Sequence, residues 1–490
     1  MVTVTQNQFD GGLAEDIRSQ TTNEFYSSLN FDVQSNTNRA TPNVDLETEV
    51  FLSGDITDKR ISEMGTDDNG NLVVIGRNST ASPTVLDIMS KNSTTDITST
   101  WSSLSTLSGV SLYVKNTLAI YLNQTFIITG DNHIRYYNGS WNDLGSTGTS
   151  ATTGQAKPYR SLADDLLYIF QRNKVFRTNS TGTAFSTYFS FPTKYNITSA
   201  TNYGSDLAVS ISPNYAGHSY LATLDRISTN TSPRNLVDWG EGSLAIVENI
   251  QDTIIGVSTN EALFAPSSTF TAVKVKKIFI KAYNGGAVEL IKEITVPSTV
   301  TLKQYKFLKD NQLYFGCDGD DALYCVRKNK RGRWVVNKEY YIANGTTVTS
   351  LNGFYFAGDY LFTMYDTAGG SGFFMRTDNS NTYTNSSVIE TLINPQMDID
   401  DRSKSKQLKS FSVSKASTTG ELNIYYSVDG SAYVLLGTLT SGTSTTLKGS
   451  AEASATPLAT GYEFQFKIVS TGGAELTEYK YSYEVIKELI

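Results

Sequence analysis

Histidine is scarce in this chain of 490 residues, which contains only His133 and His218. A Ser/His/Asp or Cys/His catalytic arrangement would need one of them as its base, and neither lies in a nucleophile motif. His133 alternates with Ile134 in a strand-like run, which favours a position on the surface of a sheet. We therefore predict that the protein is not an enzyme.

Cysteine is equally scarce, with Cys317 and Cys325 as the only two. This number excludes a disulfide framework, and with two histidines a zinc site lacks ligands. The seven residues between the cysteines can form a hairpin that places the thiols on adjacent strands. We expect two reduced, partly buried thiols, because cysteine commonly serves as a small core residue, and we expect no cofactor.

Charge is also low, because charged residues make up 18% of the chain, below the roughly 25% usual for soluble domains. The net charge is −8 and the pI is about 5.1, which argues against a general nucleic-acid binder, since phosphate neutralisation needs concentrated Lys and Arg. Ser, Thr, Asn and Gly take the place of charge. Such a surface is typical of proteins in large assemblies or outside cells.

Long apolar runs are missing, so no segment is expected to span a membrane. The first eight residues have neither a basic nor an apolar region of the kind that secretion signals carry. We expect a soluble protein made in a cytoplasm.

The most informative pattern that is present is a phrase repeated seven times between Asn71 and Arg376: a polar turn, a short apolar run, a second strand-like run and a long polar stretch. A repeat of roughly 40 to 60 residues that is built only of strands is typical of β-propeller blades. We therefore predict an all-β fold with a β-propeller of about seven blades. The apolar runs cover residues 71–75, 125–129, 165–170, 206–210, 252–256, 311–315 and 359–363.

Three domains are expected along the chain. Residues 1–60 are polar and poorly periodic, which indicates an extended N-terminal arm, and residues 61–395 contain the propeller. Within the propeller, the longer strand pair at 273–280 and 288–294 is interpreted as an excursion from a blade. Residues 396–490 alternate between apolar and polar positions, as at Phe464, Phe466 and Ile468. This alternation predicts a C-terminal β-sandwich of jelly-roll type.

Two kinds of turn carry residues that also occur in functional motifs. Ser427-Val-Asp-Gly430 resembles part of the Asp-box turn of sialidases, but it occurs once and outside the propeller, so it is interpreted as a turn between strands. The acidic stretches 66–70 and 318–321 place oxygen ligands close together, yet neither has the spacing of a calcium loop. We interpret both as acidic hairpin turns and predict no metal site.

The run from Arg327 to Trp334 is the densest basic segment of the acidic chain. One interpretation is a solvated hairpin tip. The other is a basic lumen or interface patch that faces DNA or an acidic neighbour. The patch residues are Arg327, Lys328, Lys330, Arg331 and Arg333.

The N-terminal segment carries an ordered set of motifs: an aromatic residue before Gly-Gly, then Asn and an aromatic residue, then a basic residue shortly before Pro. This order resembles the opening of bacteriophage tail nozzle proteins and related propeller-bearing virion proteins, which lie at the distal end of a short tail, typically as six-fold rings. The resemblance implies that these residues dock onto neighbouring subunits, and it brings no catalytic residue. They are Phe9, Gly11, Gly12, Asn30, Phe31, Arg39 and Pro42.

The resemblance implies a structural virion protein, a nozzle or hub ring subunit that forms part of the genome conduit and gate. It would be located in the virion tail and assembled in the host cytoplasm. Its partners would be other copies of itself, expected as a hexameric ring, tail proteins such as an adaptor or a fibre, and DNA in passage. Two alternatives stay open: an adsorption or decoration protein that binds a host glycan, and a carbohydrate hydrolase with paired carboxylates.

Overall fold

The computed structural model describes residues 2–6, 27–29, 31–32, 41–42, 46–48, 60–77, 85–92, 101–108, 118–129, 131–148, 158–161, 163–214, 217–227, 232–260, 275–329, 332–343, 347–358, 360–368, 372–377, 390–393, 404–416, 418–449 and 457–486. These residues contain many strands and no helix, so the fold is all-β, as predicted. In this part of the chain there is accordingly no helix that is long and apolar enough to cross a membrane.

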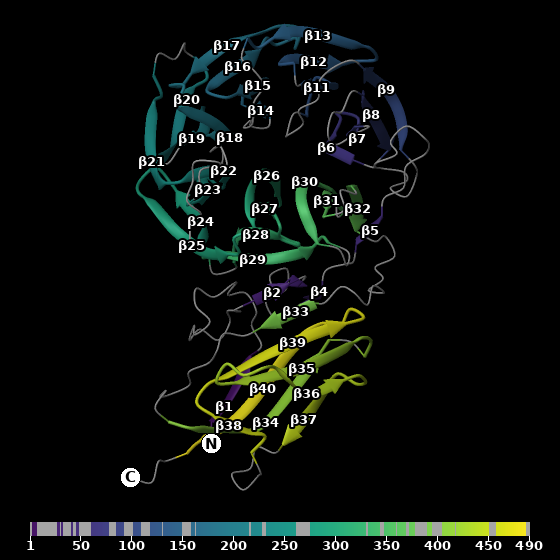
Figure 1. Ribbon diagram of the computed structural model, residues 1–490, viewed down its shortest axis with the longest axis vertical. Coiled ribbons are helices and arrows are strands. Elements are labelled where there is room, and N and C mark those ends of the chain that lie inside the picture. Colours follow the sequence, from purple (N-terminus) through teal and green to yellow (C-terminus); the bar gives the residue numbers. More distant parts are fainter. Residues whose placement is uncertain are drawn as a thin grey trace. The chain divides into compact units, whose positions relative to one another are not determined.

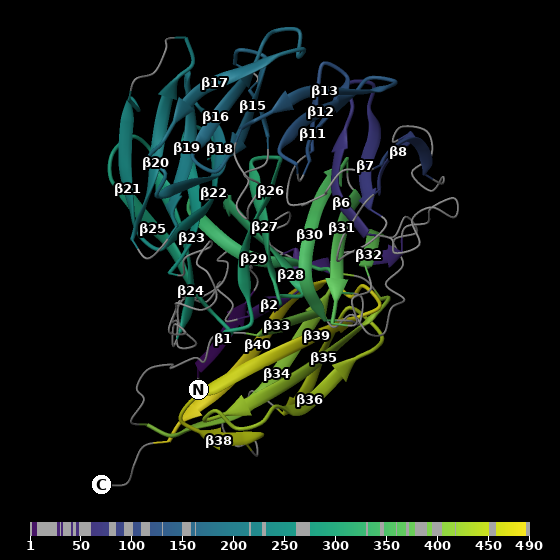
Figure 2. The ribbon, with the colours of Figure 1, turned by 45° about the horizontal axis from the view of Figure 1, so that its top comes forward.

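The chain divides into two compact units. Residues 47–320 and 346–377 form the first, which we call the ring unit. Residues 1–46, 321–345 and 378–490 form the second, which we call the sandwich unit. Figures 1 and 2 show the strands of both.

Seven sheets of four strands each are found among the described residues. In six of them the strands follow one another in chain order, and the seventh has the order β30-β31-β32-β5. The strands are β6 (Arg60–Thr66), β7 (Asn71–Arg77), β8 (Val85–Asn92), β9 (Ser102–Ser108), β10 (Ala119–Tyr121), β11 (Gln124–Ile128), β12 (His133–Tyr137), β13 (Trp141–Ser146), β14 (Tyr159–Ser161), β15 (Leu166–Gln171), β16 (Lys174–Thr178), β17 (Phe185–Ser190), β18 (Tyr195–Tyr203), β19 (Asp206–Pro213), β20 (His218–Asp225), β21 (Asn235–Glu241), β22 (Ser243–Ile250), β23 (Thr253–Thr259), β24 (Lys276–Tyr283), β25 (Val288–Val296), β26 (Thr301–Lys309), β27 (Gln312–Asp318), β28 (Ala322–Lys328), β29 (Trp334–Tyr341), β30 (Val348–Ala357), β31 (Tyr360–Thr367), β32 (Gly372–Thr377) and β5 (Leu46–Thr48).

Each of the seven apolar runs falls on the second strand of one of these sheets, from β7 to β31. All eight residues of β19 are buried, for example. A strand in the middle of a sheet that is covered on both faces reads as a continuous apolar run, without the alternation of a half-exposed strand. The repeated phrase is therefore the signal of a well-buried second strand in these sheets.

The first strands of the sheets form a closed cycle. Each of β6, β10, β14, β18, β22 and β26 contacts the first strand of the next sheet, and β30 contacts β6. Figure 1 shows the sheets following one another around a centre. Apolar clusters fill the spaces between successive sheets, and one of them joins Met64 and Leu72 of the first sheet to Phe362 and Phe374 of the last. The fold is therefore propeller-like.

The strands β24 and β25 correct one prediction. They were expected to be an excursion from a blade, but they are the third and fourth strands of the sheet β22-β23-β24-β25. Their register includes a bulge between Ile280 and Lys281. The pair looked unusual in sequence because both strands are long and rich in charge, which a third and fourth strand tolerate near the rim.

The sandwich unit contains two five-stranded sheets among the described residues. One has the order β1-β40-β34-β37 with β38 beside β34, and the other has the order β2-β33-β39-β35-β36. A further pair joins β3 to β4. The strands are β1 (Val2–Gln6), β2 (Ser27–Leu29), β3 (Phe31–Asp32), β4 (Thr41–Pro42), β33 (Glu390–Ile393), β34 (Lys406–Lys415), β35 (Glu421–Val428), β36 (Val434–Leu439), β37 (Ser444–Gly449), β38 (Ala459–Gly461), β39 (Phe464–Thr471) and β40 (Leu476–Val485).

One apolar cluster lies between these two sheets. It contains Phe464, Phe466 and Ile468, the face that the alternating pattern predicted to be buried. The ring of Phe466 lies 4.8 Å from the rings of both Phe411 and Tyr481. Aromatic side chains from β34, β39 and β40 therefore form the centre of this core.

The N-terminal segment differs from the extended arm that residues 1–60 were expected to form. In this segment β1 pairs with β40, β2 pairs with β33, and β5 is the last strand of the sheet β30-β31-β32-β5. Edge pairing relies on main-chain hydrogen bonds, which need no apolar periodicity in the added strand. The second sheet also includes β33, which starts at Glu390, inside the range 61–395 assigned to the propeller.

Candidate functional site

The turns between the first and second strands are a recurrent polar feature of the ring unit. Leu122-Asn123, Gln251-Asp252 and Asp310-Asn311 all have positive φ at both residues. Two consecutive positive φ values are the geometry of tight hairpin turns, in which Asn and Asp are favoured. Because the sheets share one strand order around the cycle, these turns and the ends of the first strands come to the same face of the ring unit. We call this the turn face.

Arg160 links three successive sheets on the turn face. From β14 its Nη1 lies 3.0 Å from Oδ1 of Asp68, in the turn before β7, and its Nη2 lies 3.3 Å from Oδ1 of Asp165. The backbone N–H of Asn123, before β11, donates to Oδ2 of the same Asp68 at 2.7 Å. These carboxylates are therefore occupied by protein donors.

Lys306 links three further first strands along the wall of the ring. From β26 its Nζ lies 2.8 Å from Oε2 of Glu248 on β22. It also donates to the carbonyl oxygens of Ala200 on β18 at 2.7 Å and of Val247 at 2.5 Å. The lysine and glutamate side chains are 14% and 12% exposed. This buried contact ties the sheets together where their first strands meet.

Tyr159 and Asn202 continue the same polar wall. The backbone N–H of Asn202 donates to the hydroxyl oxygen of Tyr159 at 3.1 Å. Burial, together with the negative charge of Glu248, raises the pKa of Tyr159 to about 12. The hydroxyl is therefore neutral near pH 7. It serves as a hydrogen-bonding group and not as a base.

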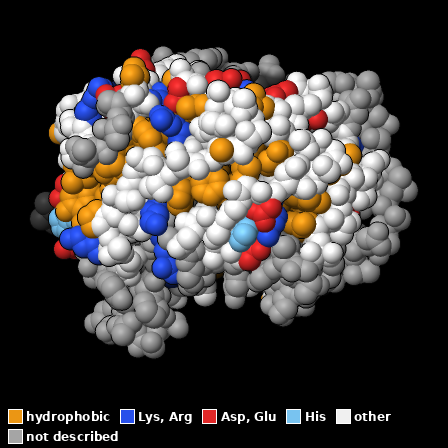
Figure 3. Space-filling view, turned by 90° about the horizontal axis from the view of Figure 1, so that it is seen from above, with side chains coloured by type: hydrophobic (Ala, Val, Ile, Leu, Met, Phe, Trp, Pro, Cys, Tyr) orange, Lys and Arg blue, Asp and Glu red, His pale blue; other side chains and the backbone are white. Residues whose placement is uncertain are grey.

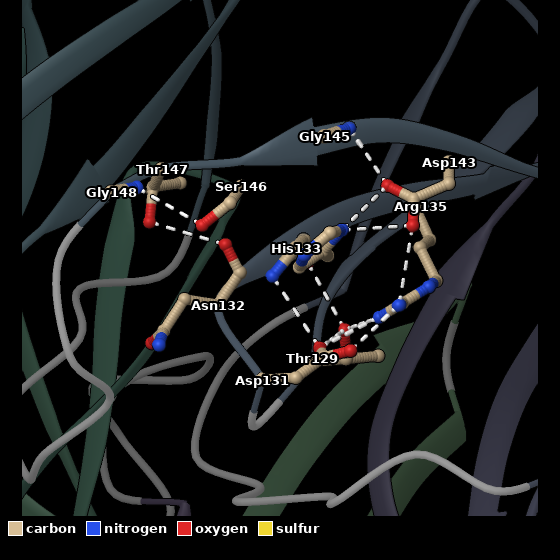
Figure 4. A network of polar contacts seen from close by, with 10 residues as sticks. All are labelled: Thr129, Asp131, Asn132, His133, Arg135, Asp143, Gly145, Ser146, Thr147 and Gly148. Carbon is tan, nitrogen blue, oxygen red and sulfur yellow. Dashed lines mark hydrogen bonds and ion pairs between the residues drawn. The ribbon is translucent and has the colours of Figure 1, made fainter.

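His133 lies in the polar network shown in Figure 4. Its Nδ1 lies 2.8 Å from Oδ2 of Asp143 on β13. Arg135 makes two bonds of 2.7 Å to the carboxylate of Asp131 and a longer contact of 3.2 Å to Asp143. The Asp143 carboxylate also accepts the N–H of Gly145 at 2.7 Å, at a bulge between β12 and β13.

His218 has the same arrangement in the sheet β18-β21. Its Nδ1 lies 2.8 Å from Oδ2 of Asp238, and Asp238 accepts the N–H of Gly240 at 2.8 Å. Both histidines begin the third strand of their sheet, and both carboxylates precede a bulge in the fourth. The two histidines of the chain therefore hold equivalent positions. In Figure 3 a histidine lies at the surface beside acidic and basic side chains.

The electrostatics of the His133 network favour an ion-paired structure and disfavour acid catalysis. The hydrogen bond from Arg135 holds the pKa of Asp131 far below its usual range. Burial opposes ionisation of Asp143, but bonds from His133 and Gly145 outweigh it and keep its pKa low. A glycosidase acid needs a raised pKa to carry its proton near neutral pH. The pKa values of Asp131 and Asp143 are lowered instead, so neither carboxyl group is suited to carry a proton near neutral pH.

The basic run does not form one exposed patch. Arg327 is buried and its Nη2 lies 2.6 Å from Oε1 of Glu339, so it is corrected from patch residue to part of an internal ion pair. Lys328 is exposed, with Nζ 4.8 Å from the ring of Trp334, and Arg333 is exposed in the hairpin between β28 and β29. Lys330 and Arg331 lie outside the described residues.

The predicted docking residues fall mostly outside the described part of the chain: Phe9, Gly11, Gly12, Asn30 and Arg39. Of the other two, Phe31 in β3 is paired with Pro42 in β4. Among the described residues, the structure therefore brings together one residue of the second motif and one of the third.

The remaining sequence motifs have structural roles. Asp67 accepts from the N–H groups of Asn69 and Asn71 within its own turn. Asp318 pairs with Lys303 and accepts the N–H of Leu351 at 2.7 Å. No three Asp, Glu, His or Cys side chains are grouped to hold a metal ion in the described ranges.

Two further sequence features have structural roles: the turn at Ser427–Gly430 and the two cysteines. Asp429 has positive φ and accepts the N–H groups of Tyr462 and Glu463 through Oδ1, which agrees with its interpretation as a turn. Cys317 on β27 and Cys325 on β28 are buried and not joined by a disulfide, as expected.

Sequence reasoning missed Lys306, Glu248, Arg177 and Arg226. No motif surrounds them, and the first three have partners from other sheets. β26 contains two further lysines and only one buried residue, so its sequence gave no signal that singles out Lys306.

No protein-family model matches the chain, and no curated protein matches it. Among solved structures, it is similar to the extracellular domain of a protein assigned to the one-component systems of B. thetaiotaomicron, with 11% sequence identity and a TM-score of 0.41. The match covers 80% of this chain and 45% of that one, so this chain spans less than half of its length.

Proposed function

We propose that the chain is a structural subunit of a bacteriophage tail, which forms a ring with other copies of itself and acts as a nozzle or hub without catalysis. The first reason for this proposal is the motif order of the N-terminal segment, which resembles the opening of tail nozzle proteins. The closed cycle of four-stranded sheets supports a seven-bladed propeller. The two five-stranded sheets support a sandwich, which we propose to be of jelly-roll type.

The observation that carries this proposal is the tie that Lys306 makes across β18, β22 and β26. An ammonium group that bridges three first strands makes the wall of the ring unit rigid and occupies space on its inner side. A rigid wall of this kind suits a protein whose role in an assembly is mechanical and not catalytic. The conduit for the genome would then lie between copies of the chain, and the hexameric ring, its adaptor or fibre partners and its place in the virion tail are part of the same proposal.

Electron microscopy of the purified protein, and of particles that contain it, tests this function. We expect rotationally symmetric rings. The variant Phe9→Ala/Arg39→Ala changes two predicted docking residues and no described strand, so it should fold normally and fail to form rings. Val434→Ala, at an exposed position of β36, is the matched control. A protein that stays monomeric both in solution and in particles would refute the proposal.

A glycan-binding adsorption protein is the second candidate, because one cluster on the sandwich unit favours it. Tyr425 and Tyr433 are partly exposed, and Nζ of Lys467 lies 5.3 Å and 5.6 Å from their rings. Val434 and Leu435 beside them are 53% and 48% exposed. Aromatic side chains with one polar end suit a wet, half-apolar surface.

A glycan array separates the two candidates. Binding that Tyr425→Ala/Tyr433→Ala abolishes, in a protein that forms no ring, would favour adsorption. Rings without glycan binding would favour the tail component.

A further inference from the structure

The seam between the sheets β14-β17 and β18-β21 contains a buried guanidinium group with unused donors. Arg226 follows β20 and is 5% exposed. Its Nη2 donates to Oδ1 of Asn202, whereas its Nε and Nη1 are buried and have no hydrogen-bond partner. A buried charged donor without an acceptor is unfavourable. The described residues supply no acceptor for these two donors, so an acceptor from outside them would be favourable.

Three carboxylates near this seam are engaged with other cations, and a fourth, Asp164, accepts the hydroxyl of Tyr168 at 2.6 Å. Asp225, next to Arg226 in sequence, lies 2.7 Å from Nη2 of Arg234, and Asp206 lies 2.8 Å from Nη1 of the same arginine. Glu248 pairs with Lys306 at 2.8 Å. Within the described ranges, Arg226 has no ion-pair partner.

A second guanidinium group comes to the same seam from the neighbouring sheet. Nη1 of Arg177 on β16 donates to the carbonyl oxygen of Arg226 at 2.8 Å. Its Cζ lies 4.6 Å from the ring of Tyr188, whose hydroxyl donates to the carbonyl oxygen of Asp225. A second positive side chain thus contacts the main chain of Arg226 at this seam. Such a pair raises the local affinity for an anion.

We propose that this seam, which we call the Arg226 site, binds a small oxyanion of the phosphate class. Nη2 of Arg226 has one hydrogen bond, so it can combine with either Nη1 or Nε to present the two-donor fork of a guanidinium group. That fork matches two oxygens of a phosphate group. The phosphate group could belong to inorganic phosphate or to a nucleic-acid backbone, which share this chemistry. The Arg226 site is independent of the proposed tail function.

Calorimetric titration of the full chain with sodium phosphate, at an ionic strength matched with sodium chloride, tests the Arg226 site. We expect saturable binding by the wild-type protein, at least tenfold weaker binding by Arg226→Gln, and unchanged binding by Arg333→Gln. Arg333→Gln removes the same charge from an exposed hairpin. Arg226→Lys keeps the charge and loses the fork, so it should also weaken binding.

A second measurement does not depend on variants that must fold. Wild-type crystals soaked with tungstate should show anomalous scattering within hydrogen-bond distance of Nε or Nη1 of Arg226. No saturable heat with phosphate, equal binding by the wild-type protein and Arg226→Gln, or tungstate bound only elsewhere would overturn the proposal.

A short single-stranded DNA distinguishes the two sources of phosphate. Competition between this DNA and inorganic phosphate, lost in Arg226→Gln, would identify a backbone phosphate as ligand. Phosphate binding that DNA does not affect would identify the free anion.

Discussion

The ring unit and the sandwich unit bury their apolar residues in different ways. The ring unit divides its core into several clusters, each shared by two sheets that are neighbours in the cycle, as Ile134 and Leu167 show in one of them. The sandwich unit has one cluster to which β34, β35, β36, β39 and β40 all contribute. The core of the ring unit can therefore be assembled from contacts between neighbouring sheets. The core of the sandwich unit forms only when strands from both of its sheets are in place.

The two units also use polar groups differently. The ring unit places ion pairs between neighbouring sheets, such as Lys306 with Glu248. The described centre of the sandwich unit is aromatic, with Phe411, Phe466 and Tyr479 in mutual contact. We therefore expect the stability of the ring unit to depend on its charged side chains. The stability of the sandwich unit should depend on the volume of its aromatic side chains.

The largest expected effect is loss of volume in the sandwich core. Phe466 is fully buried, and Phe466→Ala should lower the free energy of unfolding of the sandwich unit by about 3–5 kcal/mol, because it leaves a cavity among aromatic rings. Urea unfolding followed by fluorescence checks this. Val434→Ala on an exposed position is the control. Equal losses in the two variants would contradict a single cooperative core.

Loss of charge in the ring unit comes next. Lys306→Met keeps the length of the side chain but leaves Glu248 without its cation, so the free energy of unfolding should fall by about 3 kcal/mol. Lys306→Met/Glu248→Gln should recover part of this loss. Urea unfolding of both variants measures the coupling. Destabilisation of the double variant beyond the single one would show that the pair is not the cause.

Acid should affect the His133 network more weakly. The folded-state pKa of Asp131 lies below its unfolded value of about 3.9, so its ionised form stabilises the fold above that pH and the contribution is lost as pH falls towards the folded pKa. The stability difference between the wild-type protein and Asp131→Asn should therefore be largest near pH 6 and shrink below about pH 4. Asp252→Asn, in an exposed turn, is the matched control. A constant difference across this range would contradict the argument.

The smallest effect is expected on the turn face. Arg160 and its partners Asp68 and Asp165 are 33%, 42% and 63% exposed, and exposed ion pairs contribute roughly 0.2–1 kcal/mol. Arg160→Gln should therefore change the free energy of unfolding by no more than about 1 kcal/mol. Addition of salt should narrow even that difference. A larger, salt-insensitive loss in thermal or urea unfolding would mean that Arg160 is structurally essential.

Much of the strand pattern was predictable, and most of the polar sites were not. The second strands were predictable because burial on both faces leaves a nearly continuous apolar run, as in β15. The faces of β39 followed from alternation at Phe464, Phe466 and Ile468. In contrast, β1 pairs with β40, which lies near the other end of the sequence. No local pattern in the five residues of β1 predicts which strand it pairs with.

By itself, the sequence determined that the chain is all-β, that its strands recur as a propeller-like series of sheets, and that an alternating region follows them. These features depend on which faces of a strand are buried, and the spacing of apolar residues along the strand shows this directly. Only the tertiary structure decided that the N-terminal strands join distant sheets, that Arg327 is buried, and that Lys306 and Arg177 reach partners in other sheets. Such contacts depend on the distance between side chains in space, which composition and periodicity do not encode.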